Sequence, residues 1–250
     1  MTPVLEVRGA AYHLPGRGKG EGVNRMLVAD VSFEVGAGET LVLLGRSGSG
    51  KTTTLKLVNR LLEPTEGEIH VAGRRTREAD PHRLRRGIGY VIQDVGLFPH
   101  FTIEQNIGLV PRLEGWTPGR VAARVRELLT LVGLDPDGFA GRRPHELSGG
   151  QRQRIGVARA LAADPPLLLM DEPFGALDPI TRVELQREFK RLEERLGKAV
   201  VFVTHDVREG LLLGTRIGLM QEGNLVFLGT PQEFRRSAHP ECREFLEAAA

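Results

Sequence analysis

Four short apolar runs, with helical patterns between them, dominate the chain. The runs occupy residues 40–45, 88–93, 166–172 and 199–205. Each run is continuous rather than alternating, as expected of parallel strands that are covered on both faces. Apolar residues at helical spacing fill 52–63, 120–133, the stretch from the glycines at 149–150 to Pro165, and 182–197. Strands that alternate with helices predict an α/β fold with a mostly parallel sheet.

Shorter apolar runs near the two ends predict added antiparallel strands at 4–9, 31–35, 217–221 and 225–229. The Gly-rich, charged stretch 15–25 predicts an exposed hairpin loop between the first two of them. Residues 94–150 contain helical patterns without a clear strand, so we expect a helical subdomain inserted into the sheet domain. The resulting single domain, 1–250, has a core with an antiparallel β subdomain (1–93 and 151–235), the helical subdomain and a short tail (236–250).

The composition limits the class of protein. Of 250 residues, 40% are hydrophobic and 26% are charged, which is ordinary for a globular domain and unlike a disordered chain. The net charge of +2 gives no indication of nucleic-acid or membrane binding. A single cysteine, Cys242, cannot form an internal disulfide. The chain shows neither a signal peptide nor a run of ~18 apolar residues, so we expect a soluble chain that a partner must hold at any membrane.

Residues 45–53, GRSGSGKTT, match the pattern G-x-x-x-x-G-K-[ST], and we call them the phosphate loop. Its glycines let backbone N–H groups close around a β-phosphate, Lys51 reaches the β- and γ-phosphates, and the Thr52 hydroxyl binds Mg²⁺. Only 5 of the 34 basic residues are Lys, yet Lys stands at this position, where a planar guanidinium would not fit. The loop predicts a P-loop NTPase core for the α/β fold, and ATP and Mg²⁺ as cofactors. Its members are Gly45, Arg46, Ser47, Gly48, Ser49, Gly50, Lys51, Thr52 and Thr53.

Two carboxylates follow the apolar run 167–170, in the sequence LLLMDEP. Ligands of parallel α/β sheets bind at the carboxyl ends of the strands, where this pair is expected to lie. Asp171 can hold Mg²⁺, and Glu172 can orient or deprotonate an attacking water. An apolar run that ends in Asp-Glu can equally be a helix cap or a surface turn, and the phosphate loop decides for the functional interpretation.

Two further polar residues follow predicted strands. His205 ends the run 199–205 and is expected at the same sheet edge, near the γ-phosphate. Gln93 ends the run 88–93 and could bind Mg²⁺ and sense the γ-phosphate. Taken alone, a His or a Gln after a strand is more often structural.

The sequence LSGGQ, residues 147–151, stands before a predicted helix and resembles a second anion site. Free N–H groups, small side chains and the positive end of a helix dipole favour an anion at this place. Ser148, Gly149, Gly150 and Gln151 could cap the γ-phosphate held by a second subunit in a head-to-tail dimer. A plain helix cap explains the same residues equally well.

The motifs together resemble the nucleotide-binding subunit of ATP-binding cassette (ABC) transporters, over almost the whole chain. The motifs are the phosphate loop, Gln93, LSGGQ, the Asp-Glu pair, GALD at 175–178 and His205, in this order. The resemblance implies an ATPase that works as a head-to-tail dimer, with Asp178 acting across the interface. It also implies that Tyr12 stacks on adenine, although Tyr12 lies farther from the phosphate loop than is usual in the family.

Residues 55–69 and 88–111 resemble a narrower group, the ATPases of importers for glycine betaine, choline and other quaternary-amine osmoprotectants. Only some sixteen residues follow GTPQEF (229–234), so we expect no regulatory domain of the kind that larger members carry. In the family, the loop after Gln93 receives a cytoplasmic helix of the membrane permease, so Leu97 and Phe98 are expected to dock it. For this loop the alternative is a plain subdomain linker in which Phe98 faces the core.

The resemblance also implies a solute-binding protein as an indirect partner, a location at the cytoplasmic face of the membrane, and no binding of nucleic acid.

Three other functions are alternatives to an osmoprotectant importer. The subunit could serve an importer of another small solute, such as an amino acid. A non-transport ABC ATPase, acting in DNA repair or on the ribosome, usually has a long coiled coil or two cassettes, and this chain has neither. A regulatory ATP-binding module without turnover is opposed by the presence of both Glu172 and His205.

Overall fold

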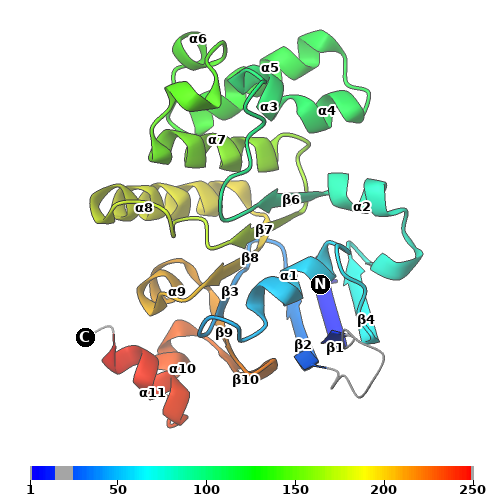
Figure 1. Cartoon of the computed structure of the whole chain (residues 1–250), viewed down its shortest axis with the longest axis vertical. Helices are drawn as coiled ribbons and strands as arrows, with labels where there is room; N and C mark the ends of the chain where they lie inside the picture. The colour runs from blue at the N-terminus through cyan, green and yellow to red at the C-terminus, as the bar shows by residue number, and fades with distance from the viewer. Residues whose placement is uncertain (1, 15–24, 249–250) are drawn as a thin grey trace, which may run out of the picture. The chain divides into compact units, whose positions relative to one another are not determined.

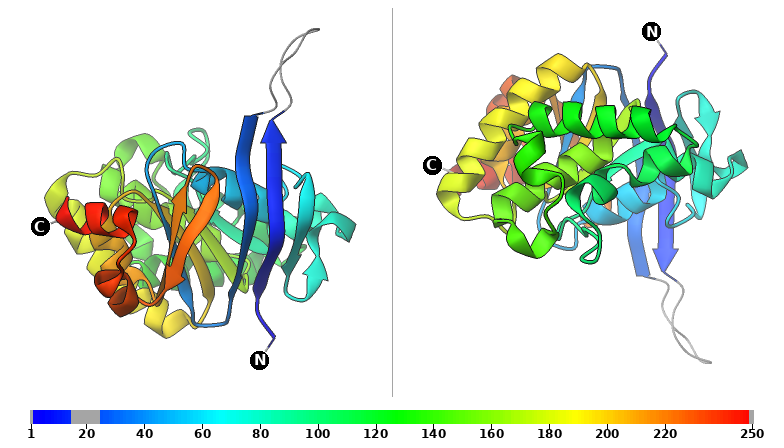
Figure 2. Two further views of the ribbon diagram at one scale, coloured as in Figure 1. Left: turned by 90° about the horizontal axis from the view of Figure 1, so that it is seen from below. Right: turned by 90° about the horizontal axis from the view of Figure 1, so that it is seen from above.

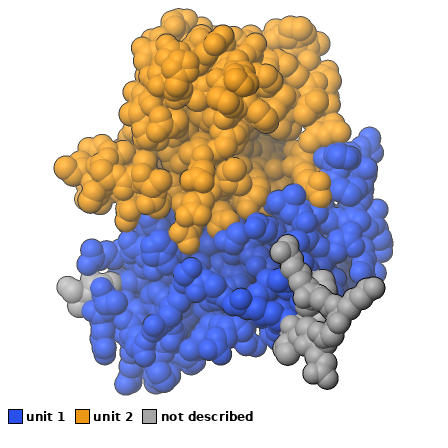
Figure 3. All heavy atoms as spheres, viewed as in Figure 1, with its two compact units in different colours: residues 1–84, 199–250 blue, residues 85–198 orange. Residues whose placement is uncertain are grey.

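The computed structural model describes residues 2–14 and 25–248. The chain forms two compact units, and Figure 3 colours them separately: unit 1 is residues 1–84 with 199–250, and unit 2 is residues 85–198. The predicted hairpin loop 15–25 lies almost entirely outside the described residues. Among the described residues, no helix combines the length and the apolar character needed to cross a membrane.

Unit 1 contains an antiparallel sheet in the order β2-β1-β4-β5. Its strands are β1 (Leu5–Leu14), β2 (Arg25–Val35), β4 (Glu66–Val71) and β5 (Arg74–Arg75). Figure 2 shows β1 and β2 as a long pair lying side by side, and residues such as Leu5 and Val35 are register partners. The predicted antiparallel strands at 4–9 and 31–35 are therefore confirmed, whereas β4 and β5 were not predicted.

A second group of strands in unit 1 runs in the order β10-β9-β3-β8. Its strands are β3 (Thr40–Leu44), β8 (Ala199–Thr204), β9 (Arg216–Gln221) and β10 (Asn224–Gly229). β3 pairs in parallel with both β8 and β9, and β10 is antiparallel to β9. The prediction that 217–221 is an antiparallel strand is therefore correct for its pairing with β10 and wrong for its pairing with the central strand β3, which is parallel.

Helices of unit 1 pack on this second group of strands. They are α1 (Lys51–Val58), α9 (Val207–Leu213), α10 (Pro231–Arg236) and α11 (Pro240–Glu247). Figures 1 and 2 show α10 and α11 beside β9 and β10, where Phe234 and Cys242 join a fully buried apolar cluster with Leu44 and Leu219. Residues 236–250, which were predicted as a short tail, therefore include helix α11 and contribute Cys242 to the core of unit 1.

Unit 2 contains the parallel pair β6 (Ile88–Val91) and β7 (Leu167–Asp171) and most of the helices. Between residues 94 and 150, a stretch that the structure describes in full, it has helices and no strand. The helices are α3 (Ile103–Ile107), α4 (Leu109–Leu113), α5 (Pro118–Leu131), α6 (Pro136–Phe139), α7 (Gly149–Leu161) and α8 (Pro179–Leu196). Helix α7 contacts β6, α3, α5 and α8, so it is the centre of this unit. The short helix α2 (Pro81–Arg86) precedes β6.

The four predicted central strands are all present as β3, β6, β7 and β8, and three predicted helices match α5, α7 and α8 to within a few residues. The predicted helix 52–63 is shorter than expected, since α1 ends at Val58. Asn59 accepts a hydrogen bond from the Leu61 amide (3.1 Å), and Arg60 has φ 54°, a left-handed backbone that no helix can continue.

Candidate functional site

The phosphate loop connects β3 to α1 in unit 1, the context that its motif requires. A Cβ atom on Gly45 would lie 2.4 Å from the Met220 carbonyl oxygen, and Gly50 has φ 101° with its Cβ position 2.5 Å from the Leu27 carbonyl oxygen. Neither position can carry a side chain without displacing backbone. The loop therefore keeps its shape only with glycine at both places.

Lys51 lies inside this loop and is only 4% exposed. Its Nζ donates hydrogen bonds to the carbonyl oxygens of Gly45 (2.7 Å) and Arg46 (2.9 Å). The Ser49 hydroxyl is buried and has no hydrogen-bond partner among the described residues, and the first turn of α1 carries no acidic residue. A polyphosphate fits these three features: a buried ammonium group, a buried hydroxyl without a hydrogen-bond partner, and a helix N-terminus without acidic residues.

Arg46 ties the phosphate loop to the C-terminal helix α11. Its Nε donates to Glu241 (2.8 Å), and its guanidinium also pairs with Glu244. The hydrogen bond to Glu241 is the main cause that raises the pKa of Arg46. Gln221 donates to the same Glu241 (3.3 Å), and Arg46, Gln221 and Glu241 line a cavity of about 380 Å³ beside the phosphate-loop residues 47–49. The contact between Arg46 and Glu241 was not predicted, because no local sequence signal links the two residues.

His205 leaves the sheet at the same edge as the phosphate loop. Leu44 and Thr204 are register partners in the parallel pair β3–β8, so Gly45 and His205 both follow the carboxyl ends of these strands. The His205 side chain is exposed. The Thr204 hydroxyl beside it donates to the buried carboxylate of Glu209 (2.5 Å) and accepts from the Asp206 amide (3.0 Å), which fixes the turn in which His205 stands.

Tyr12 lies on β1 of unit 1 and is half-buried, opposite Val28 of β2. The register of β1 with β2 is irregular on both sides of Tyr12. The strand continues to Leu14, where the described part of this hairpin arm ends. An adenine-stacking role for Tyr12 stays a prediction.

In unit 2, Asp171 and Glu172 stand at the carboxyl end of β7, as predicted. Asp171 is buried, and Tyr90 of the neighbouring strand β6 contacts it; burial first, and then the negative charge of Asp171, raise the pKa of the Tyr90 phenol. Glu172 has φ 44°, a left-handed backbone that is rare for a residue with a long side chain. Strained backbone of this kind is common at active sites, although other non-glycine residues of this chain, such as Arg60 and Ala72, share it. The backbone carbonyl oxygen of Glu172 accepts from the Gly175 amide (3.1 Å) and closes a turn.

Gln93 also lies beyond the carboxyl end of the β6–β7 pair, but not at the end of its strand. The last register pair is Val91 with Met170, and β6 stops at Val91. Gln93 is therefore an exposed loop residue two positions past the strand, and the predicted strand 88–93 was too long. Asp171, which directly follows Met170, belongs to the same edge of unit 2.

Ser148 caps the N-terminus of helix α7 with both its side chain and its backbone amide. Its Oγ accepts from the Gln151 amide (3.2 Å), and the Gln151 side chain accepts from the Ser148 amide (3.0 Å). These two hydrogen bonds form a complete capping box, so LSGGQ has the geometry of a helix cap. Ser148 is nevertheless exposed, and no acidic residue lies in the first turn, so an anion can approach. The two interpretations are compatible.

Asp178 is the matching cap of helix α8. Its carboxylate accepts from the Thr181 amide (3.0 Å), and this hydrogen bond is the main cause that lowers the pKa of Asp178. The side chain is exposed on the surface of unit 2. It is therefore ionised at neutral pH and accessible to another chain.

The segment after Gln93 is anchored by backbone contacts rather than by its apolar side chains. Arg159 of α7 donates to the carbonyl oxygens of Val95 and Gly96, and the fully buried Asn106 accepts from the Phe98 amide (2.8 Å). Phe98 itself is 46% exposed and lies against Phe101, with ring centroids 5.2 Å apart. The alternative of a core-facing Phe98 is therefore wrong, whereas Leu97 is half-buried.

Comparison with known proteins identifies relatives over most of the chain. The family model described as ABC transporter matches residues 28–175. The glycine betaine/carnitine/choline transport ATP-binding protein of Bacillus subtilis is 54% identical over 88% of this chain and 57% of its own length. The osmoprotectant import ATP-binding protein of Salmonella typhimurium is 53% identical over 82% and 54%. The glycine betaine uptake system ATP-binding protein of Escherichia coli is 50% identical over 88% and 71%. The chain thus spans little more than half the length of the first two.

Solved structures agree with this result. A dimeric ATP-binding cassette in a post-hydrolysis state, bound to ADP and phosphate, superimposes with a TM-score of 0.79 at 32% identity, covering 91% of this chain and 98% of that one. The predicted α/β fold, a P-loop NTPase core with an antiparallel β subdomain and helices, is therefore confirmed. On the family match, the identities and this likeness, the chain belongs to the ABC transporter family.

Proposed function

We propose that this chain is the ATP-hydrolysing subunit of an ABC importer for quaternary-amine osmoprotectants such as glycine betaine or choline. The observation that carries the proposal is the identity of 50–54% to transport ATP-binding proteins that are named for these solutes. The geometry of the phosphate loop supports the nucleotide part of it, because a buried lysine and an orphaned hydroxyl fit a polyphosphate.

ATP would be held by the phosphate loop of unit 1. The ammonium of Lys51 would exchange its two loop carbonyls for phosphate oxygens, and backbone N–H groups of the loop would donate to the same phosphates. The hydroxyl of Thr52 and the side chains of Asp171 and Gln93 are the oxygen donors that suit Mg²⁺. Bound Mg²⁺ supplies charge neutralisation for the transferred phosphoryl group.

The carboxylate of Glu172 is the proposed general base. Its strained backbone holds it directly after the Mg²⁺ carboxylate, where it can accept a proton from the attacking water. His205 is proposed to donate a hydrogen bond towards the γ-phosphate, from a turn that Thr204 and Glu209 keep rigid. Tyr12 is proposed to stack on the adenine ring.

The exposed caps of α7 and α8 are proposed to face a second nucleotide-binding subunit. Ser148 and the amides of Gly149 and Gly150 would donate to the γ-phosphate bound by that subunit, and Asp178 would act across the same interface. ADP lacks the γ-phosphate, so the pair would separate after hydrolysis. The dimeric form of the solved cassette supports this arrangement.

Leu97 and Phe98 are proposed to receive a cytoplasmic helix of the permease, which would hold this chain at the cytoplasmic face of the membrane. The Arg159 contacts to Val95 and Gly96 join this segment to α7, so a displacement after Gln93 would reach the helix that begins at LSGGQ. A solute-binding protein would then interact only through the permease. An importer of another small solute remains the second candidate, and it shares every feature of the nucleotide site.

Uptake measurements in the native host test the proposal. A strain without this gene is complemented with the wild type or with Glu172→Gln, and uptake of labelled glycine betaine, choline and glutamine is measured at high osmolarity. Glu184→Gln, an exposed substitution on α8, is the matched control. We expect the wild type and the control to restore glycine betaine or choline uptake, and Glu172→Gln to restore less than a hundredth of it, since loss of a general base costs ~10²–10⁴-fold. Restored uptake of glutamine alone would identify the alternative, and normal uptake with Glu172→Gln would contradict the role of Glu172.

A further inference from the structure

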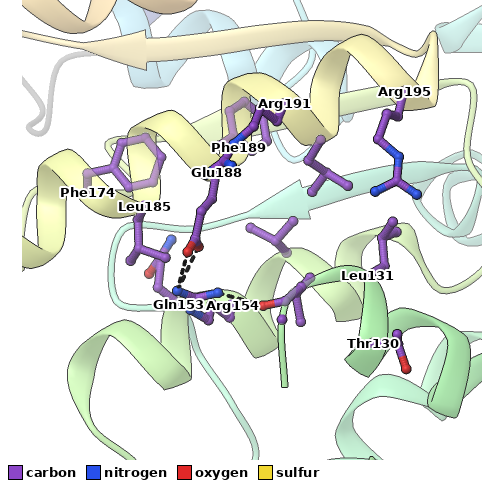
Figure 4. Close-up of a pocket in the computed structure, with 14 residues that line it drawn as sticks. Thr130, Leu131, Gln153, Arg154, Phe174, Leu185, Glu188, Phe189, Arg191 and Arg195 are labelled. Atoms are coloured by element: carbon purple, nitrogen blue, oxygen red, sulfur yellow. Dashed lines mark hydrogen bonds and ion pairs between the residues drawn. The ribbon is translucent and has the colours of Figure 1, made fainter. Parts of the chain in front are cut away.

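Unit 2 contains a partly open cavity of about 330 Å³ that belongs to none of the nucleotide motifs. Figure 4 shows it between helix α8 and the helices α5 and α7. Its walls are apolar, formed by Leu131, Val157, Leu185, Phe189 and Leu192. The volume lies in the range of about 300–1,000 Å³ that is typical of small-molecule sites. At roughly 30 Å³ for each water-sized group, it holds on the order of ten non-hydrogen atoms.

One end of the cavity carries a buried hydrogen-bond donor without a partner. Gln153 of α7 is only 3% exposed, lines the cavity, and its Nε2 has no hydrogen-bond partner among the described residues. An unsatisfied buried amide costs about 1–3 kcal/mol, so it is a feature that a ligand would relieve. In Figure 4, Gln153 lies near Leu185, away from Arg195.

Arg154, which lies beside Gln153 in Figure 4, is already satisfied, since it pairs with Glu188 (2.7 Å) and donates to the Val132 carbonyl (2.7 Å). The other end carries Arg195, which is exposed and has no acidic partner among the described residues. Arg191, one turn before it on α8, also lines the cavity without an acidic partner in the described part of the chain, and its Nε donates to the Arg187 carbonyl oxygen (3.4 Å). Because Arg154 and Glu188 compensate each other, Arg191 and Arg195 leave an excess of two positive charges along α8. This end favours an anion, and a carboxylate matches a guanidinium best.

The two ends are separated by about ten residues along α8, from Leu185 to Arg195, or about 15 Å at 1.5 Å per residue. We propose that this cavity binds a medium-chain carboxylate of about ten carbons that carries a hydrogen-bond acceptor at its far end. The carboxylate lies at Arg195, with Arg191 one turn away, the aliphatic chain lies along the apolar walls, and the acceptor meets Nε2 of Gln153. The ligand would lie between the helices that begin at Ser148 and Asp178. The proposal does not depend on the transport function.

Calorimetric titration of the whole chain with 10-hydroxydecanoate, below the concentration at which it self-associates, tests the site. Decane-1,10-diol lacks the carboxylate, and decanoate lacks the distal acceptor. We expect saturable 1:1 binding of 10-hydroxydecanoate, at least fivefold tighter than binding of either comparator. Absence of saturable binding, or equal affinity for the diol, would overturn the proposal.

Variants separate the two ends of the site. The exposed double variant Arg191→Gln/Arg195→Gln should bind 10-hydroxydecanoate at least fivefold more weakly, whereas Arg187→Gln, exposed on the same helix and outside the cavity, should stay within twofold of the wild type. Gln153→Leu should lose the preference for 10-hydroxydecanoate over decanoate. If the double variant binds like the wild type, or Arg187→Gln loses as much affinity, the assignment is wrong; this comparison stands even if Gln153→Leu does not fold.

Discussion

Replacing Glu193 with glutamine should remove a pH dependence from the stability of unit 2. Glu193 lies on α8, is only 6% exposed, and its Oε2 has no hydrogen-bond partner among the described residues. The nearest cation, Lys190, is 3.7 Å away, too far for a hydrogen bond. Burial therefore raises the pKa of Glu193 from 4.5 to about 7, with Lys190 opposing the change and Glu194 adding to it.

The sign follows from proton binding. Between pH 4.5 and 7 the folded chain keeps this proton while the unfolded chain has released it, so stability is lost as the pH rises through this interval. The interval corresponds to about 3 kcal/mol at 1.36 kcal/mol for each pH unit. Screening by water and ions around Lys190 reduces the expected effect to about 2 kcal/mol.

Urea unfolding of the wild type and of Glu193→Gln, measured at intervals from pH 5 to pH 8.5, gives the difference in their free energies of unfolding at each pH. We expect similar free energies of unfolding at pH 5 and a variant that is more stable by about 2 kcal/mol at pH 8, because glutamine has no charge to bury. Glu194→Gln, an exposed neighbour, is the control and should follow the wild type. Parallel curves for the wild type and Glu193→Gln at every pH would refute the reasoning.

Two further predictions concern the permease-docking segment and the phosphate loop. Changing Leu97 to Ser and Phe98 to Gln should leave the melting temperature of the isolated chain within a few degrees of the wild type, because the Asn106 hydrogen bonds hold the backbone. The same double variant should co-purify with the permease severalfold less than the wild type does. An unfolded double variant would contradict the docking role. Gly45→Ala should destabilise the chain by about 1–3 kcal/mol and abolish ATP binding, because its methyl group would lie 2.4 Å from the Met220 carbonyl oxygen; Gly141→Ala, with open space around its Cβ, should change neither quantity in equilibrium dialysis and urea unfolding.

Local signals explain why much of the site could be predicted from the sequence. The phosphate loop and the Asp-Glu pair each follow an apolar run and precede a helical pattern, and LSGGQ precedes a helical pattern. The predicted ends of the strands and helices therefore place all three motifs. Even Glu172, whose φ of 44° no sequence pattern indicates, stood at the predicted strand end. The position of His205 after a strand was predicted correctly, because its apolar run forms β8, a parallel neighbour of the strand before the phosphate loop. Its place near the γ-phosphate stays a prediction.

Features that depend on contacts between distant residues could not be predicted. The pairing of Arg46 with Glu241 joins residues 195 positions apart, and charged residues occur all along the chain, so nothing marks these two as partners. The parallel pairing of β9 depends on its neighbour β3 and not on its own apolar pattern. The cavity at Gln153 depends on the packing of α5, α7 and α8, which periodicity does not determine.

The central claim is that LSGGQ of one chain completes the nucleotide site of another. The most direct measurement mixes two variants, Lys51→Ala and Ser148→Arg, and follows association by sedimentation with a non-hydrolysable ATP analogue. A mixed dimer has one composite site with both substitutions and one with neither. We predict that each variant alone stays monomeric and that the mixture forms a nucleotide-dependent dimer, since the intact site keeps charge-assisted hydrogen bonds of roughly 1.5–3 kcal/mol each. If each variant alone dimerises as the wild type does, or the mixture forms no nucleotide-dependent dimer, Ser148 is a helix cap only and the composite site does not exist.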